Sequence, residues 1–520
     1  AIFTGEITGS EDCLFLNIYT PSLDMDLSTK YPVMFFIHGG SFNSGSGSYK
    51  TYGPDYLVSQ DVILVTFNYR LGVFGFLSNP DWEIYGNMGL KDQRLALKWI
   101  HENIERFGGD KDRITIFGES AGAASVHYLM MDNSTSTYYA RAILQSGSAP
   151  NPWAVQITPK KRVEALKTAL NITKDCKNEF LTMDYKKIIN AAEVQVPTAN
   201  DTKHATKPVF NPVIENNCSV DPIVTKHILN RTKQGYFPDK DIIIGFNNAE
   251  GLLAMNRVQN ESSPEVNNTL KDVRRAIPIF YNSNNYTIAN ESVTKLAEYY
   301  NNITSENNPY EGYIQLMGDA WFLHGINRTI TAISEIPKQN RTAKMYVYRL
   351  SDSSYSVYKK YLFKNEKWKN LTGVCHTDDL GYLFSMCEYP LGKYFFRVYA
   401  EIPEEAQQTH RRMVTLWTNF AKTGNPLSGK QSNGTEEGQS VSGPSYGNLT
   451  GIIWNEYNIS NHQYLEMNQT GFYMTPVQEE KRMDLWYGVY KEYKNETTKS
   501  DNEETTNCTK INNTQQKKVK

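Results

Sequence analysis

The sequence Ile114-Thr-Ile-Phe-Gly-Glu-Ser-Ala-Gly-Ala-Ala-Ser-Val126 decides how the rest of the chain is interpreted. Its first four residues are β-branched or apolar and favour a strand, and the alanine-rich residues 123–131 favour a helix. Between them lies the pattern G-x-S-x-G, with Ser120 at its centre and Gly118 and Gly122 on either side. This pattern is typical of a sharp strand-to-helix turn that holds the serine in strained backbone angles.

The chain contains a second match to the same pattern, Gly443-Pro-Ser-Tyr-Gly447. It follows a polar stretch, no apolar run precedes it, and no helix-forming run follows it. Pro444 suits a turn. The context therefore favours Ser120 over Ser445 as a nucleophile.

Composition indicates a globular protein with a sizeable core. The chain has 520 residues, of which 40% are hydrophobic and 12% aromatic. The formal net charge of −2 gives no reason to expect attraction to nucleic acid or to anionic lipid. No apolar run approaches the roughly 18 residues of a membrane-spanning helix. We therefore expect no nucleic-acid partner and no membrane span.

Glycosylation sequons are unusually frequent. Asn-x-Ser/Thr occurs 20 times, whereas chance placement predicts roughly 7. The excess favours a secreted glycoprotein over a chain that is merely rich in asparagine. Disulfide bonds suit that setting, and spacing does not choose among the fifteen pairings that six cysteines allow. The cysteines form no metal-type cluster, so we expect no metal; they are Cys13, Cys176, Cys218, Cys375, Cys387 and Cys508.

Strands that alternate with helices in the N-terminal third predict an α/β fold with a mostly parallel central sheet flanked by helices. The strands expected there are residues 14–19, 31–37, 62–67, 114–117 and 140–147. Residues 87–107 are expected to form a helix that stops at Gly108-Gly109. Its apolar face is expected to consist of Leu95, Trp99, Ile100 and Ile104.

The remainder of the chain has fewer strands, and no linker divides it, so we expect residues 1–494 to form a single domain. Further strands are expected at residues 241–246 and 345–350, with a final one at 463–467, and helices at 404–421 and 479–493. Residues 428–450 are expected to form a polar loop. From residue 495 to 520 the composition predicts a disordered tail.

A serine hydroxyl attacks a carbonyl only when a base removes its proton and an acid orients that base. With a strand-to-helix serine, the acid and then the histidine follow in the chain, each on a loop after a strand. Glu250 directly follows the strand at 241–246. His376, in Gly373-Val-Cys-His376, follows the strand at 345–350, and Gly373 permits a tight loop. We therefore assign Ser120, Glu250 and His376 as the candidate catalytic residues.

The competing side chains have weaker contexts. Asp239 and Asp241 lie before the strand rather than after it. The remaining histidines after Ser120 fall in polar loops or on helices, where a surface or packing role is more common; they are His127, His204, His227, His324, His410 and His462.

Negative charge that develops on the ester oxygen during attack needs hydrogen-bond donors, each worth roughly 2.7–4 kcal/mol in studied cases. His38-Gly-Gly-Ser-Phe42 follows a buried strand and forms a glycine-rich turn. The backbone N–H groups of Gly40 and Ser41, with that of Ala121, are the candidate donors.

Eight motifs stand in order along the chain: Glu11-Asp-Cys-Leu-Phe-Leu-Asn17, His38-Gly-Gly-Ser-Phe42, Asn68-Tyr-Arg-Leu-Gly72, Gly86-Asn-Met-Gly-Leu-Lys-Asp-Gln93, Phe107-Gly-Gly-Asp110, Gly118-Glu-Ser-Ala-Gly122, Gln145-Ser-Gly-Ser148 and Gly373-Val-Cys-His376. With these motifs the chain resembles the type-B carboxylesterase/cholinesterase family, most closely its insect carboxylesterases, over roughly residues 6–490.

The resemblance implies an α/β-hydrolase fold and a serine carboxylesterase that cleaves small-molecule carboxylic esters through an acyl-enzyme, without a cofactor. It implies the same catalytic residues and oxyanion donors as the residue pattern. It adds Trp153 as one side of the acyl pocket. Glu119 falls where the family keeps a buried carboxylate, and Ser146 where it keeps a serine that supports the site.

Two departures from the family pattern stand out. The family has further residues before Glu11, including a cysteine that pairs with the one at Cys13, so we expect an N-terminally truncated chain. The third glycine that is usual in the oxyanion loop is replaced here by Ser41.

The particular ester stays open at this stage. Leu252-Leu253-Ala254 follows the acid where cholinesterases carry aromatic residues for a quaternary ammonium, which argues against choline esters. Juvenile hormone esterases usually carry Gln where this chain has Glu119. Pheromone, odorant, dietary and xenobiotic esters remain, as do two other roles: a binding protein without turnover, and an esterase so slow that it sequesters its ligand.

Overall fold

The computed structural model describes most of the chain. The described residues are 7–23, 30–156, 158–172, 177–196, 210–216, 218–226, 228–233, 237–258, 260, 263–277, 290–305, 308–337, 339–363, 365–386, 401–428 and 446–497. Residues 443–445 of the second G-x-S-x-G match, residues 429–445 of the predicted polar loop and residues 498–520 of the predicted tail lie outside these ranges.

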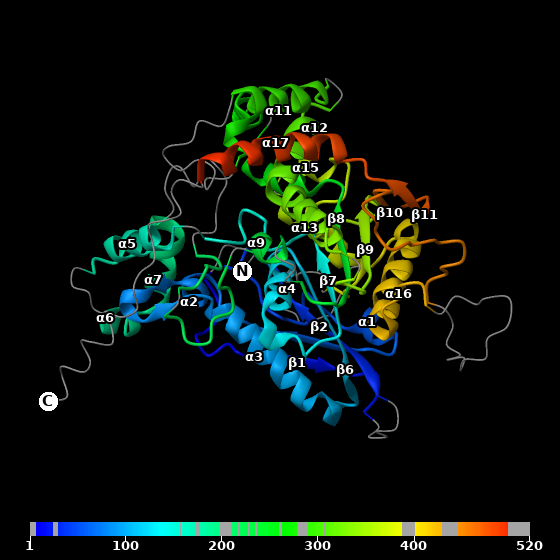
Figure 1. Cartoon of the computed structure of the whole chain (residues 1–520), viewed down its shortest axis with the longest axis horizontal. Helices are drawn as coiled ribbons and strands as arrows, with labels where there is room; N and C mark the ends of the chain where they lie inside the picture. The colour runs from blue at the N-terminus through cyan, green and yellow to red at the C-terminus, as the bar shows by residue number, and fades with distance from the viewer. Residues whose placement is uncertain are drawn as a thin grey trace.

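A nine-stranded sheet forms the centre of the molecule, in the order β1-β3-β2-β6-β7-β8-β9-β10-β11 (Figure 1). The two edge pairs, β1 with β3 and β10 with β11, are antiparallel, and every pairing between them is parallel. The strands are β1 Leu16–Tyr19, β2 Tyr31–Ile37, β3 Ile63–Phe67, β6 Gly109–Glu119, β7 Arg141–Gln145, β8 Asp241–Asn247, β9 Met345–Leu350, β10 Gln463–Asn468 and β11 Gly471–Pro476. A separate two-stranded ribbon joins β4 Ser78–Asn79 to β5 Ile84–Tyr85.

Helices cover the sheet and extend from it in two groups. In Figure 1, α5, α6 and α7 lie together on the left, and α11, α12 and α17 lie together at the top. The α-helices are α1 Asp55–Val58, α2 Gly72–Phe76, α3 Met88–Asn103, α4 Ala121–Met131, α5 Pro159–Ala169, α6 Lys177–Leu181, α7 Tyr185–Asn190, α9 Ile228–Lys233, α10 Glu265–Lys271, α11 Asn290–Asn302, α12 Glu311–Gly318, α13 His324–Ser334, α14 Val357–Leu362, α15 Glu366–Lys369, α16 Gln407–Thr423 and α17 Glu480–Thr497. Short 3₁₀ or π turns include η2 Ile104–Phe107, η4 Ala191–Gln195, η5 Glu250–Arg257, η6 Val273–Arg275, η8 Asp319–Leu323 and η9 Asp378–Tyr382.

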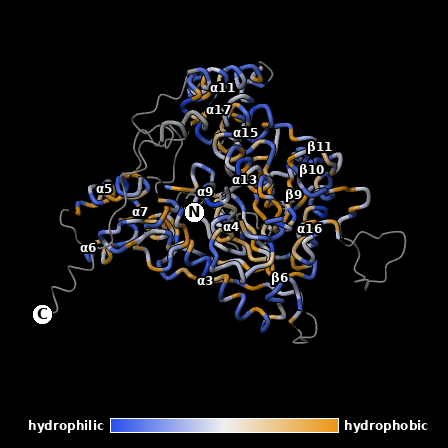
Figure 2. Tube along the Cα trace, in the orientation of Figure 1, coloured by the Kyte–Doolittle hydropathy of each residue, from blue (hydrophilic) through white to orange (hydrophobic). Residues whose placement is uncertain are grey.

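Two hydrophobic cores lie on opposite faces of the sheet because side chains alternate along each strand. In β2, Val33, Phe35 and Ile37 belong to one core, whereas Met34 and Phe36 belong to the other. Figure 2 shows hydrophobic residues gathered around β9 and α13 in the middle of the molecule. A strand that is buried on both faces has a continuous apolar sequence. For this reason residues 31–37 could be predicted as a strand from the sequence.

The predicted apolar face of α3 was partly wrong. Leu95 and Trp99 are exposed, with 63% and 40% of their surface accessible, whereas Leu97, Ile100 and Ile104 are buried. Residues 97, 100 and 104 also have helical spacing, so two registers fitted the sequence. The choice between them depends on the sheet that the helix covers, which local periodicity does not reveal.

The predicted end of the sheet also needs correction. Residues 463–467 do form a strand, β10, but it is not the final one. It turns at Asn468 and pairs with β11 in an antiparallel hairpin, with Asn468 opposite Gly471. The last helix, α17, reaches Thr497 and so includes the first residues of the predicted tail. The single-domain interpretation stays a prediction, although both halves of the chain contribute strands to one sheet.

A buried ion pair connects α17 to η8. Arg482 Nε lies 2.8 Å from Asp319 Oδ2. Tyr300 of α11 also donates its hydroxyl to Asp319, at 2.6 Å, and Trp486 Nε1 donates to that hydroxyl at 2.8 Å. Burial raises the pKa of Asp319 to about 6, against the opposing effect of Arg482. Removal of either Asp319 or Arg482 would leave an uncompensated buried charge. This ion pair is therefore important for the position of η8.

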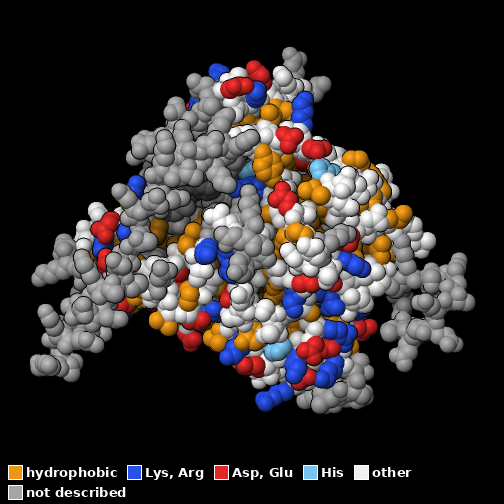
Figure 3. Space-filling view, in the orientation of Figure 1, with side chains coloured by type: hydrophobic (Ala, Val, Ile, Leu, Met, Phe, Trp, Pro, Cys, Tyr) orange, Lys and Arg blue, Asp and Glu red, His pale blue; other side chains and the backbone are white. Residues whose placement is uncertain are grey.

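The surface carries charges of both signs. On the face drawn in Figure 3, Lys and Arg side chains are interspersed with Asp and Glu side chains. Among the described residues, no helix combines the length and the apolar character needed to cross a membrane.

Gly245 provides a test of the packing between β8 and β9. It pairs with Tyr348, and a Cβ at position 245 would lie 2.2 Å from the Tyr348 ring, which is fully buried. We expect Gly245→Ala to lower the free energy of unfolding by about 1–3 kcal/mol through overpacking. Thermal and urea unfolding followed by circular dichroism would measure it. Gly471→Ala is the matched control, because a Cβ at that position would have no atom within 4 Å; an equal loss in both variants would contradict the packing argument.

Candidate active site

Ser120 lies at the turn between β6 and α4 in a strained conformation, with φ 57° and ψ −122°. The two glycines of the motif permit this turn. A Cβ at Gly122 would lie 1.9 Å from the carbonyl oxygen of Ile37 in β2, and one at Gly118 would lie 2.5 Å from the carbonyl carbon of Gly122. Neither position has room for a side chain, which explains the spacing of the motif.

The structure brings Ser120, His376 and Glu250 together in one hydrogen-bonded chain. His376 Nε2 lies 2.9 Å from Ser120 Oγ, and His376 Nδ1 lies 2.7 Å from Glu250 Oε2. All three side chains are buried, with no more than 6% of their surface accessible. An ionised carboxylate can only accept, so Nδ1 carries the proton and Nε2 accepts from the serine hydroxyl.

Backbone contacts hold the Glu250 and His376 loops together. Ala249 N donates to Val374 O at 3.2 Å, and Val374 N donates to Asn248 Oδ1 at 2.8 Å. Gly373 has φ 101°, and a Cβ there would lie 2.5 Å from Ala249 Cβ. The tight loop expected at Gly373 is therefore present, and it brings the histidine to the end of the neighbouring strand.

Sequence reasoning missed Asn247, which binds the carboxylate of Glu250, and Asp379, which accepts from the side chain of Asn247. Asn247 N donates to Glu250 Oε1 at 2.8 Å, and its side-chain amide donates to Cys375 O at 2.9 Å and to Asp379 Oδ1 at 3.3 Å. Gln145 Nε2 donates to Asp379 Oδ2 at 2.7 Å. The adjacent acids Asp378 and Asp379, just after His376, were a signal that could have identified this network.

Two further buried acids, Glu119 and Asp379, lie close to the histidine, and a third, Asp378, follows it by two residues in the chain. Burial raises the pKa of Asp378 and that of Asp379 to about 6. Burial, reinforced by Asp379 and Glu250, holds the pKa of Glu119 well above its usual range. Glu119 Oε1 lies 3.2 Å from His376 Nε2. A protonated Glu119 avoids adding another negative charge to this crowded site.

The glycine-rich loop after β2 presents free backbone donors. Gly40 has φ 106° and Ser41 has φ 57°, so the serine that replaces glycine adopts the left-handed conformation. Within the described residues, the N–H groups of Gly40, Ser41 and Ala121 have no acceptor. A Cβ at Gly39 would lie 3.1 Å from Ser120 Cβ, which places this loop directly against the serine.

His38 anchors the start of this loop. Its Nδ1 lies 2.8 Å from Gly39 O, and Tyr69 donates its hydroxyl to His38 O at 2.8 Å. The His38 and Tyr69 rings are stacked with centroids 4.4 Å apart. Burial lowers the pKa of His38 to about 4, so it is neutral at ordinary pH and has a structural role.

Phe322 packs on the histidine, a contact that the sequence did not indicate. Its ring centroid lies 4.1 Å from that of His376. Phe322 belongs to the π turn η8, and π turns often occur at functional sites. The ion pair of Asp319 with Arg482 fixes the first residue of the same turn. The C-terminal helix therefore contributes to the placement of His376.

Trp153 lies among the aromatic side chains near the serine. Its ring centroid is 5.9 Å from that of Phe322 and 6.5 Å from that of Phe42, which follows the oxyanion loop. Its Nε1 donates to Trp321 O at 2.7 Å, and Asn211 Nδ2 donates to Trp153 O at 2.5 Å. These contacts place an apolar surface next to the reacting groups.

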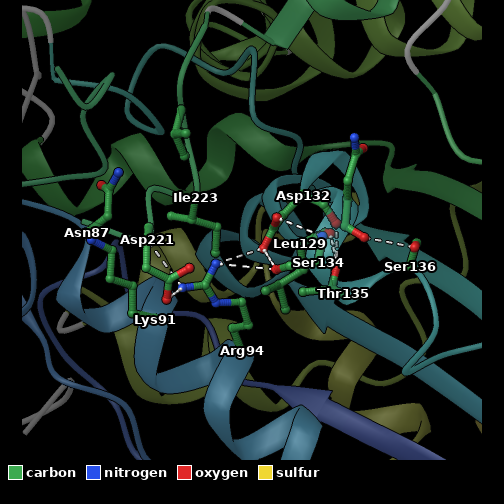
Figure 4. Close-up of polar contacts among 12 residues, drawn as sticks. Asn87, Lys91, Arg94, Leu129, Asp132, Ser134, Thr135, Ser136, Asp221 and Ile223 are labelled. Carbon is green, nitrogen blue, oxygen red and sulfur yellow. Dashed lines mark hydrogen bonds and ion pairs between the residues drawn. The ribbon is translucent and has the colours of Figure 1, made fainter. Parts of the chain in front are cut away.

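Residues 210–216 and 218–224 are fixed to α3, and Asn211 among them contacts Trp153. The side-chain amide of Asn87 pairs with both backbone groups of Val213, at 2.8 Å each. Lys91 Nζ lies 2.7 Å from buried Glu215. Figure 4 shows Arg94 between Asp221 on one side and Asp132 with Ser134 on the other. Sequence reasoning missed this connection because its partners lie more than 120 residues apart.

The structure places Ser146 immediately after β7, with φ 52°. Its backbone N–H donates to Gly245 O at 2.9 Å, and its hydroxyl is buried without a hydrogen-bond partner among the described residues. The next residue, Gly147, lies against the serine turn, since a Cβ there would be 2.3 Å from Ser120 O. No group of three His, Cys, Asp or Glu side chains in the described ranges could hold a metal ion.

The parallel sheet, the serine turn and the Ser–His–Glu chain define an α/β-hydrolase of the serine esterase kind. A model of the carboxylesterase family matches residues 2–486, and the chain belongs to this family. It is therefore a serine carboxylesterase, a carboxylic ester hydrolase.

Relatives of known kind agree with this assignment. The chain is 33% identical over 435 residues to a juvenile hormone esterase of Tribolium castaneum, covering 81% of this chain and 71% of the relative. It is 33% identical over 392 residues to Esterase B1 of Culex pipiens, covering 73% and 69%. The crystal structure of juvenile hormone esterase from Manduca sexta, with OTFP covalently attached, superposes with a TM-score of 0.73 at 26% identity, covering 93% of this chain and 84% of that one.

The raised pKa of Glu119 gives a test that depends on pH. Above the ordinary glutamate pKa of about 4.3, the unfolded chain loses a proton that the native chain retains, so rising pH destabilises the native state. Glu119→Gln cannot ionise. We expect its unfolding free energy, relative to wild type, to increase with pH from 5 upward by up to about 1.4 kcal/mol per unit.

Urea unfolding across that pH range would measure the difference. Glu366→Gln on exposed α15 is the matched control and should follow the wild-type curve. If the unfolding free energy of Glu119→Gln, relative to that of wild type, decreased as the pH increased, Glu119 would be ionised in the native state.

Proposed function

We propose that Ser120 is the nucleophile, His376 the general base and acid, and Glu250 the group that orients the imidazole. The observation that carries this proposal is the continuous chain of 2.9 and 2.7 Å contacts through the two ring nitrogens of His376. Distances in this range suit proton transfer. The strained conformation of Ser120 adds support, because such strain is usually retained only where it serves function.

The geometry supports a two-step mechanism. Ser120 Oγ attacks the ester carbonyl carbon while His376 Nε2 takes the hydroxyl proton. The tetrahedral intermediate collapses, His376 returns the proton to the departing alcohol, and an acyl-serine remains. Water then attacks with the same base, which releases the carboxylic acid and restores the serine. Glu250 stays ionised throughout and stabilises the transient imidazolium.

Gly40, Ser41 and Ala121 are proposed as the oxyanion donors. Their free N–H groups support this role, since a donor with no prior acceptor needs no rearrangement when charge develops. Ser41 keeps its N–H despite the replacement of glycine.

Around these groups, Trp153 is proposed to line the acyl side of the site, next to Phe322. Glu119 and Ser146 are proposed as supporting residues: Glu119 lies 3.2 Å from His376 Nε2, and Ser146 adjoins Gly147, which packs against the serine turn. The proposed substrates are small-molecule carboxylic esters, and the chemistry requires no cofactor.

Replacement of the nucleophile tests the proposal. Ser120→Ala should reduce kcat for p-nitrophenyl acetate by about 10⁶-fold, as removal of a catalytic serine does in studied enzymes. Ser445→Ala, at the second G-x-S-x-G match, is the matched control and should retain wild-type kcat. Labelling by an organophosphate followed by peptide mass spectrometry should place the adduct on Ser120. Unchanged hydrolysis by Ser120→Ala would reject the assignment.

The same kinetics separate the alternative roles. A burst of nitrophenol followed by negligible steady-state turnover would indicate sequestration rather than turnover. No burst and no labelling would indicate a binding protein. We expect a linear steady state after any burst.

We further propose that the protein is a secreted glycoprotein with disulfide bonds. Sequon positions support this. Ten asparagines among the described sequons are exposed: Asn133, Asn171, Asn230, Asn260, Asn267, Asn302, Asn340, Asn370, Asn448 and Asn458. Two more, Asn327 and Asn468, are half-buried and hydrogen-bonded to Tyr487 and Tyr473. Cys13 and Cys375 carry free thiols in the described structure.

Glycopeptide mass spectrometry of protein secreted from insect cells tests this proposal. We expect glycans on the exposed asparagines and little occupancy at Asn327 and Asn468, whose amides are already engaged. Secreted protein without glycans on the exposed group would contradict it. Peptide mapping without reduction would identify the disulfide pairs.

A further inference from the structure

A polar cluster lies at the end of η5 that is remote from Glu250. It consists of Arg257 at the end of η5, Arg275 at the end of η6, Tyr313 in α12 and Glu265 at the start of α10. Tyr313 lies close enough to the other three for all of them to affect its pKa. The carboxylesterase mechanism uses none of these residues.

Arg257 is a half-buried cation with no anionic partner among the described residues. Its guanidinium lies over the Trp321 ring, 5.1 Å from the centroid. It makes no hydrogen bond or ion pair within the described part of the chain. Burial lowers its pKa, which reflects the loss of water around the charged group. A ring face holds the guanidinium plane but leaves its N–H donors available.

Within the described residues, Tyr313 and Arg275 add further donors without acceptors. Tyr313 is fully buried and its hydroxyl has no partner among the described residues. Arg275 Nη2 lies 3.1 Å from Glu265 Oε2, whereas its Nε is buried and finds no acceptor in the described part of the chain. Of the charges that the structure describes in this cluster, Glu265 therefore compensates one of the two guanidinium groups, and one positive charge is left. Unpaired buried donors are rare because each costs free energy, so a ligand that accepts from them would be bound favourably.

The cluster is connected to the catalytic groups by short steps. Trp321, under Arg257, precedes Phe322, whose ring packs on His376. The carbonyl of Trp321 accepts from Trp153 on the acyl side of the site. Glu250 begins η5 and Arg257 ends it, seven residues later. A 3₁₀ helix rises by about 2 Å per residue, so the two positions are about 14 Å apart along η5.

We propose that Arg257, Tyr313 and Arg275 bind a carboxylate at the distal end of the acyl chain of an ester substrate. This inference rests on the proposed function, because it requires the ester carbonyl to lie at Ser120. A carboxylate accepts from the Arg257 fork, from the Tyr313 hydroxyl and from Arg275 Nε, and it neutralises the remaining charge. A methyl-terminated chain of equal length makes none of these contacts. It also displaces water from the Arg257 guanidinium without supplying a hydrogen-bond acceptor in its place.

The kinetic experiment compares two series of p-nitrophenyl esters across chain length. One series has acyl chains that end in a methyl group, and the other has chains of matched length that end in a carboxylate. We expect wild type to prefer the carboxylate ending by about tenfold or more in kcat/KM at one length, the size of a charge-assisted hydrogen bond. The preference should appear in KM rather than kcat, because the distal group binds ground and transition states alike.

Variants assign the preference to the cluster. Arg257→Met should bring the ratio of the two kcat/KM values to about one, and Tyr313→Phe should lower it several-fold. Arg274→Met, on the adjacent residue of η6 that pairs with Asp272, is the matched control and should keep the wild-type ratio. If Arg257→Met does not fold, Arg257→Lys keeps the charge without the fork and should give an intermediate ratio. Added salt should lower the wild-type preference while it spares the methyl-terminated esters.

Two results would overturn the inference: a wild-type ratio at or below one at every chain length, or an unchanged ratio in Arg257→Met. An equal fall in Arg274→Met would indicate a general surface potential instead of this cluster. Failure of the proposed function is distinguishable, because it appears as p-nitrophenyl acetate hydrolysis that survives Ser120→Ala.

Discussion

The close approach of α4 to β2 at Gly122 is the constraint on which the rest of the site depends. With no side chain on Gly118 or Gly122, the backbone after β6 can turn within van der Waals distance of Ile37. That contact fixes Ser120 against the glycine loop at the end of β2, so the proposed nucleophile and the proposed oxyanion donors share one junction. The strain at Ser120 is supported by the parallel pairing of β2 with β6 on the core side.

A second level of organisation is electrostatic. Three buried acids lie close to one imidazole: Glu119, Glu250 and Asp379. Like charges so close cannot all ionise in a medium of low dielectric constant, and burial favours the neutral form. Glu250 differs from the other two in its place, because it contacts His376 Nδ1, the ring nitrogen that faces away from Ser120, while its second oxygen accepts from Asn247 N. Position relative to the ring, rather than the number of donors, therefore distinguishes the acid that orients the histidine.

The sequence was sufficient to predict the elements whose signals are local. The strand at 31–37, the turn at Ser120 and the loop at Gly373 follow from apolar runs and from glycines that leave no room for a Cβ. It was insufficient where the answer depends on packing between distant segments. This applies to the buried face of α3, to the β10–β11 hairpin and to the contact of Phe322 with His376. It also applies to the attachment of Val213 to Asn87. Asp379 is an intermediate case. The sequence shows that it lies three residues after His376, but it does not show that Gln145 and Asn247 are its hydrogen-bond partners.

The ion pair between Asp319 and Arg482 also has a consequence for biosynthesis. A ribosome releases the chain from the N-terminus, so Ser120 and its glycine loop emerge long before α17. Until Arg482 is available, Asp319 lacks its cation, and η8, which carries Phe322 onto His376, lacks its anchor. The proposed nucleophile is thus synthesised well before the helix that anchors the turn packed on His376. We expect Ser120 and His376 to reach their final arrangement only after α17 has packed against η8.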